Sequence, residues 1–236
     1  QIAIGTDAGG SQQGEANISL GQAAGSFIEG NRNFHVGSNA GYSTIGDDNM
    51  AIGMQAGLST LGSRNSAIGL RAGYNSNGND NLMFGAEAGQ GIQGDYNIGL
   101  GAGAGTATGD LNTSSANIAW NRNTGQYVNG QRNTSVGMGA GFFSTGDNNV
   151  SVGQMAGSLV GFDASGALVD RAGNVVGAPT GVTVNNATAL GNLSLVLQDD
   201  GVALGSGSVA NTAAGQVGYL AGSQTDATWK GTLAAV

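Results

Sequence analysis

One motif returns along the chain at a fixed interval, and this interval limits the possible fold more than any other feature. "NMAIGMQAG" (49–57) is followed by "NSAIGLRAG" (65–73) and "NLMFGAEAG" (81–89). The central glycine of the motif recurs at a constant step of 16, at Gly5, Gly21, Gly37, Gly53, Gly69, Gly85 and Gly101. Such a period predicts a repeat architecture, in which each copy builds one unit that stacks on the next.

The later copies keep the motif but vary the interval. Asn121 takes the glycine position after a step of 20, and Gly137 and Gly153 resume the step of 16. After a longer interruption, "ATALG" (187–191) and "GVALG" (201–205) follow with a step of 14. We count twelve copies, ten of them before the longer interruption.

The length of each copy points to an all-β solenoid. A copy of this length is too short for a pair of helices, whose repeats take roughly 34 residues or more, and two glycines per motif would weaken a helix. It suits one coil made of two short strands and two turns, with glycine where a turn needs a positive φ. The recurring asparagine predicts a ladder in which each amide bonds to the copies above and below. Ten coils at about 4.8 Å each predict a rod roughly 50 Å long.

The strand pattern predicts association of several chains. In "NMAIG", Met50 and Ile52 point to one side of the strand and Ala51 to the other. Neither side carries a charge in any copy, which is typical of strands covered on both sides. The narrow inside of the coil covers one side, and identical chains around an axis would cover the other. We therefore expect a homo-oligomer.

Composition argues against most chemistry. The net charge is −8 and the seven basic residues are scattered, so we expect no binding to nucleic acid or to anionic lipid. The absence of cysteine excludes disulfides and thiol catalysis. The only histidine, His35, takes the strand position of Ala51 and Ala67, and we interpret it as a tolerated substitution near the chain interface. We predict no enzymatic activity, no metal and no cofactor.

Two further features have structural explanations. The carboxylate pairs Asp47–Asp48 and Asp199–Asp200 stand in "GDDN" and "QDDG", where aspartate favours turns. The period of the repeat also differs from that of the calcium-binding nonapeptide solenoid. "GLGAGAG" (99–105) lacks the lysine and hydroxyl residue of a phosphate-binding loop, so it does not indicate nucleotide binding.

The repeat breaks at two places. In 109–125, four extra residues precede Trp120, which takes a position usually held by isoleucine or valine. We interpret this break as a bulge repacked around the tryptophan, with a protrusion that contacts a partner as the alternative. In 158–186, "ALVDRAGNVVG" predicts a β-hairpin that turns at 171–174 and ends at Pro179. This insertion would stand off the roll as a spacer or pack against a neighbouring chain.

The motifs resemble a known family. "NSAIGLRAG", "NMAIGMQAG" and "GVALGSGSVAN" (201–211) are similar to the YadA-like head repeats of trimeric autotransporter adhesins, which are surface proteins of Gram-negative bacteria. The last step, from Gly191 to Gly205, is 14 residues, which is the repeat length common in that family. The stretch "GYLAGSQTDATWKGTLAAV" looks like the segment that joins the head to the neck. The resemblance divides the chain into head repeats, an insertion, further head repeats and a segment leading to the neck, at 1–157, 158–186, 187–215 and 216–236.

The resemblance implies a left-handed parallel β-roll, three chains to a head, on the extracellular face of the outer membrane. It implies attachment to collagen, fibronectin or laminin, to host cells or to abiotic surfaces. The stalk and the membrane anchor of the family would lie outside this chain, which begins inside a repeat and reads as part of a longer protein.

Candidate binding residues come from one motif and from three tyrosines. Collagen binding in the family is associated with "NSVAIG", and the nearest match here, one residue shorter, is Asn65, Ser66, Ala67, Ile68 and Gly69. We interpret this motif mainly as a structural one, with Ile68 facing inward. Tyrosine buries much area with few rotatable bonds, which makes contact candidates of Tyr42, Tyr96 and Tyr127.

Adhesion is the leading functional prediction, because a rigid trimeric rod makes many weak contacts at once. A trimeric phage tail-fibre segment, which uses similar repeats, is the main alternative. A solenoid enzyme acting on polysaccharide would need clustered carboxylates along one face, and an ice-binding solenoid would need a flat array of threonines; neither pattern is present.

Overall fold

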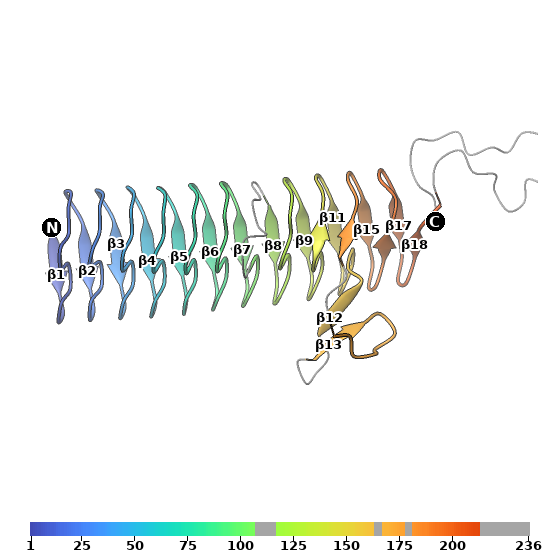
Figure 1. Ribbon diagram of the computed structural model, residues 1–236, viewed down its shortest axis with the longest axis horizontal. Coiled ribbons are helices and arrows are strands. Elements are labelled where there is room, and N and C mark those ends of the chain that lie inside the picture. Colours follow the sequence, from blue (N-terminus) through green and yellow to red (C-terminus); the bar gives the residue numbers. More distant parts are fainter. Residues whose placement is uncertain (107–116, 163–166, 178–180, 213–236) are drawn as a thin grey trace, which may run out of the picture.

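The computed structural model describes residues 1–106, 117–162, 167–177 and 181–212. These residues form a parallel β-solenoid in which the strands of successive coils lie side by side along a rod (Figure 1). We call each coil a rung. No helix occurs in the described residues. The all-β solenoid and the regular interval of its coils are thus confirmed.

One twelve-stranded sheet runs the whole length of the rod. Its strands follow chain order, and each pairs in parallel and in register with the next; for example, Met50 stands opposite Ser66. The sheet consists of β1 (Ile2–Ile4), β2 (Ile18–Leu20), β3 (Phe34–Val36), β4 (Met50–Ile52), β5 (Ser66–Ile68), β6 (Leu82–Phe84), β7 (Ile98–Leu100), β8 (Ile118–Trp120), β9 (Thr134–Val136), β11 (Val150–Val152), β15 (Thr188–Leu190) and β17 (Val202–Leu204).

The second side of the coil is much less regular than the first. In the first rungs it is reduced to single-residue parallel bridges, such as the one between Ile45 and Leu61. Two-residue strands form only toward the C-terminal end, where β10 (Ser144–Thr145) pairs with β14 (Val182–Thr183) and β16 (Leu195–Val196) pairs with β18 (Val209–Ala210). Where both sides of a rung are described, it therefore has one continuous strand and one short pairing point.

The core of the rod is narrow and is built from small side chains. The middle residue of each strand points inward, so Ala51 and Ala67 are buried, and Ala56 and Ala72 meet them from the following turn. The flanking residues point outward. Ile68 is one of these, only partly buried beside the buried Ala67. The expectation that Ile68 faces inward is therefore wrong, because the alternation of the strand turns Ala67 into the coil and the residues on either side of it outward.

Glycine is required where two rungs approach closely. Gly62 has φ 129°, and a Cβ on it would lie 2.0 Å from the carbonyl oxygen of Gly78 in the next rung. No side chain fits at that distance. Other residues with positive φ, such as Ser59 and Arg64, carry side chains that lie partly or fully at the surface. The prediction that the glycines mark turns with positive φ is confirmed.

The asparagine ladder is also confirmed, and it bonds mainly to the backbone. The side-chain oxygen of Asn65 accepts from the backbone N–H of Asn81 (3.0 Å), and its amide group donates to the carbonyl of Gly78 (2.8 Å). The same amide group also reaches Asn49 in the preceding rung (3.2 Å). The buried members of the ladder are Asn17, Asn33, Asn49, Asn65, Asn81, Asn97, Asn133 and Asn149. Each one ties consecutive rungs together from inside.

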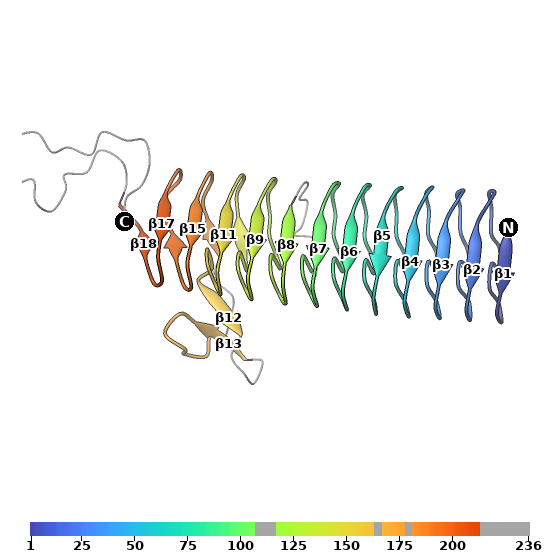
Figure 2. The ribbon, with the colours of Figure 1, turned by 180° about the vertical axis from the view of Figure 1, so that it is seen from behind.

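The longer interruption leaves the rod and returns to it. Antiparallel strands β12 (Val160–Phe162) and β13 (Leu168–Asp170) stand off the rod beside β11 and β15 (Figures 1 and 2). The chain then turns, and Val175 bridges back to Val169. Pro179 lies outside the described residues. The stretch 182–186, which sequence analysis assigned to the insertion, belongs to the rod, since β14 pairs with β10.

Candidate interaction surface

The outward side of the twelve-stranded sheet forms one extended apolar surface, which we call the strand face. It consists of two columns of side chains, one on each side of the buried middle residues, and no charged residue occurs in either column. The first column is Ile2, Ile18, Phe34, Met50, Ser66, Leu82, Ile98, Ile118, Thr134, Val150, Thr188 and Val202. The second is Ile4, Leu20, Val36, Ile52, Ile68, Phe84, Leu100, Trp120, Val136, Val152, Leu190 and Leu204.

Large side chains on the strand face remain accessible along its whole length. Ile4 is 65% exposed, Phe84 55%, Trp120 61% and Leu204 59%. A continuous exposed apolar surface of this kind marks a contact site for another molecule. The in-register stacking of the rungs places equivalent residues of successive rungs next to one another, so the two columns continue along the rod.

Trp120 belongs to this face, which corrects one expectation. It pairs in register with Leu100 and is exposed, so the chain is not repacked around it. The inserted residues 109–116 that precede it lie outside the described part of the chain.

The structure separates the five residues of the "NSAIG" motif by role. Asn65 and Ala67 are buried, and Gly69 forms a turn with φ 133°. Only Ser66 and Ile68 reach the surface, side by side on the strand face. A ligand approaching this motif would therefore meet two side chains of the five.

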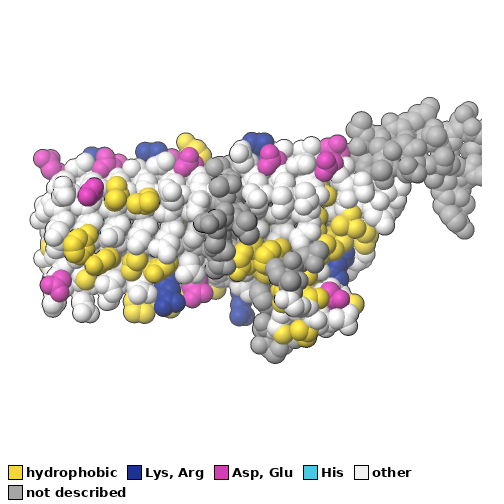
Figure 3. Space-filling view, in the orientation of Figure 1, with side chains coloured by type: hydrophobic (Ala, Val, Ile, Leu, Met, Phe, Trp, Pro, Cys, Tyr) yellow, Lys and Arg dark blue, Asp and Glu magenta, His cyan; other side chains and the backbone are white. Residues whose placement is uncertain are grey.

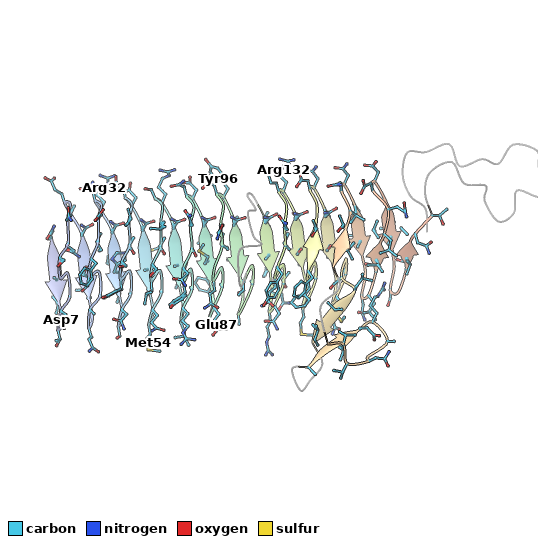
Figure 4. The ribbon with its side chains drawn as sticks, in the orientation of Figure 1. Asp7, Arg32, Met54, Glu87, Tyr96 and Arg132 are labelled. Atoms are coloured by element: carbon cyan, nitrogen blue, oxygen red, sulfur yellow. The ribbon has the colours of Figure 1, made fainter. Side chains whose placement is uncertain are left out.

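The structure does not bring the three candidate tyrosines together. Tyr42 is half-buried, with its ring edge-on to Phe27 at 5.3 Å between centroids. Tyr127 stacks on Phe143 at 4.3 Å. Tyr96 is 61% exposed and lies on the long edge of the rod that also carries Arg32 and Arg132 (Figure 4). They are separate surface or packing residues and form no common site.

A ladder of charges follows the edge that carries Tyr96. Arg32 donates two hydrogen bonds to Asp48 (2.6 and 2.8 Å), and Arg64 does the same to Asp80. These hydrogen bonds hold the pKa of both aspartates below its usual value. Charged side chains lie mainly along the two long edges of the rod in Figure 3. Sequence analysis missed this ladder, although arginine and aspartate alternate there from one repeat to the next.

The carboxylates at the turns make structural bonds. Asp47 accepts from the backbone N–H of Asn31 (2.7 Å), and Asp199 accepts from that of Asn185 (2.8 Å). Within the described residues, no three acidic, histidine or cysteine side chains are grouped in a way that could hold a metal ion.

His35 lies inside the coil, as the middle residue of β3. Its side chain is fully buried, and neither ring nitrogen has a hydrogen-bond partner. Burial lowers its pKa to about 4. Gly41 makes room for the ring, since a Cβ there would lie 2.2 Å from the imidazole Cδ2.

No protein-family model matches this sequence, and comparison with curated proteins finds no match. The described residues contain no helix that is long and apolar enough to cross a membrane.

Proposed function

We propose that this chain is the head of a trimeric surface adhesin. The observation that carries the proposal is the strand face, which leaves two apolar columns accessible over twelve rungs. Burying such a surface is strongly favourable, at about 25 cal/mol for each Å² removed from water. Identical rods arranged around a common axis bury the same face on every copy.

The motifs favour three chains and a left-handed coil, because they resemble the head repeats of trimeric autotransporter adhesins. In this arrangement the strand faces meet at the centre. The second side of each coil, which carries the single-residue bridges and which we call the bridge side, faces outward together with the charged edges. The head is carried at the surface of a bacterium by a stalk and an anchor outside this chain.

Adhesion follows from geometry and not from catalysis. A rigid rod repeats its outer surface at every rung and in every chain, so weak contacts add up through effective concentration. The partners we propose are the matrix proteins collagen, fibronectin and laminin, host cells, or abiotic surfaces.

Assembly is tested by sedimentation equilibrium at several concentrations. We expect the unmodified chain to have the mass of a trimer and the double variant Ile52→Asp with Leu100→Asp to have the mass of a monomer. The matched control is Ile45→Asp, which places a charge at an exposed position on the bridge side and should remain trimeric. A folded, monomeric unmodified chain would contradict the proposal.

Adhesion is tested on the same three proteins with plates coated with collagen, fibronectin, laminin or bare polystyrene. The trimers should be retained on at least one coating, and the double variant should wash off faster because it has lost multivalency. A stable trimer that is retained on none of them would separate assembly from adhesion and favour a purely structural fibre.

A further inference from the structure

The one histidine of the chain occupies a position that cannot accommodate a charge. His35 is the middle residue of β3 and points into the coil with 0% exposure. Both imidazole nitrogens are buried without a hydrogen-bond partner. Burying a polar group without a partner is already unfavourable, and burying its charged form is much more so.

Nothing that packs around His35 can compensate a positive charge. In register with it stand Ser19 of β2 and Ala51 of β4, and Gly41 lies against its ring. None of these residues ionises. The charged residues of the surrounding rungs lie wholly or partly at the surface; they are Glu29, Arg32, Asp47, Asp48 and Arg64. Burial is the only cause that lowers the pKa of His35.

We propose that His35 makes the N-terminal end of the rod acid-sensitive, so that protonation of its imidazole opens the structure at β3 and releases the rungs that precede it. A solenoid rung contacts only its neighbours. Within one chain, the rungs of β1 and β2 are therefore held to the rest of the rod through the rung of β3 alone. Rungs beyond β4 keep their own neighbours and stay closed.

The pH range follows from the two protonation equilibria. The unfolded chain binds the proton near the ordinary pKa of 6.5, whereas the folded chain binds it near 4. Between these values the open form holds more protons, so the closed form is fully stable above about pH 6.5 and loses stability as the pH falls toward 4. At about pH 5, opening is favoured about 30-fold relative to neutral pH.

Hydrogen exchange measured by mass spectrometry at about pH 7.5 and about pH 5, corrected for the intrinsic rate, tests this directly. We expect the opening constant of residues 1–48 to rise about 30-fold at the lower pH, with little change over 65–105. Asp48 and Asp80 stay ionised at that pH because their arginine partners lower their pKa values.

The matched variants are His35→Ala and His35→Ser, which place at this position the residues found there in Ala51 and Ser19. Both variants should lose the acid-induced opening. If one of them does not fold, the other is enough to test the proposal. The proposal is overturned if the variants open with acid as the unmodified protein does, or if the response spreads evenly along the rod.

Discussion

At the scale of single residues, the rod depends on positions that strongly favour one residue type. Asparagine suits its position because one side chain accepts from a backbone N–H and donates to a backbone carbonyl at the same time. Glycine suits the close approach of the rungs because the carbonyl of the next rung occupies the place of a Cβ. By contrast, the Arg32–Asp48 and Arg64–Asp80 pairs lie at the surface, where ion pairs add little stability.

Replacing one asparagine of the ladder should be costly. Asn65→Ala leaves the N–H of Asn81 and the carbonyl of Gly78 without their partner, and each unpaired buried group costs about 1–3 kcal/mol. We expect a clearly lower urea midpoint, measured by circular dichroism. Asn77→Ala is the control, because Asn77 lies at the surface. Equal midpoints for the two variants would mean that the ladder does not stabilise the rod.

At the scale of elements, an aromatic cluster of the rod lies next to the start of the insertion in the chain. Phe142 is 1% exposed, and its ring lies edge-on to Phe143 (4.6 Å) and to Tyr127 (5.8 Å). Its carbonyl accepts from the hydroxyl of Ser158, at the start of the insertion (3.0 Å). Tyr74, at the same position of an earlier rung, is only half-buried. The rod therefore has a local aromatic core just before the insertion, and the backbone of this core holds the first residue of the insertion.

Truncating this cluster should loosen the insertion while the rod persists. Phe142→Ala removes a buried ring, at a cost of about 3–5 kcal/mol. We expect faster hydrogen exchange over 158–177 and unchanged exchange over 33–89. Tyr74→Ala should change neither segment by a comparable amount. If Phe142→Ala instead accelerates exchange along the whole rod, the insertion and the rungs form one cooperative unit.

At the scale of the whole molecule, stability is built up rung by rung. Each rung bonds to its neighbours in the same register, so no described residue of one end contacts the other end (Figure 1). The length of the rod is therefore a property of repeat number and not of a closed core.

Removing one complete repeat should shorten the rod without unfolding it. Deleting 65–80 joins Arg64 to Asn81 and leaves Asn49 and Asn81 one repeat apart. We expect an unchanged circular dichroism spectrum and, by small-angle scattering, a rod shorter by about 4.8 Å. Deleting 65–72 should destroy this part of the fold, because half a repeat places asparagines opposite glycines. Comparable stability of both deletions would refute the role of register.

The sequence by itself determined the period, the all-β class, the turn glycines and the asparagine ladder. These features share one physical reason: a short repeat with glycine and asparagine at fixed positions can satisfy the hydrogen-bonding groups of its backbone in very few ways. The alternation of Met50, Ala51 and Ile52 also placed the two flanking side chains on one side and the alanine on the other.

The tertiary structure alone decided which side is inside. Both sides of the strands are uncharged, so the sequence pattern does not show which side is inside. The closure of the coil decides this, since it turns Ala67 inward and leaves Ile68 and Trp120 outside. The same closure buries His35 without a partner. The pairing of β12 with β13 and the Arg32–Asp48 contact were likewise decided by the folded chain, because each joins residues whose proximity depends on how the chain closes.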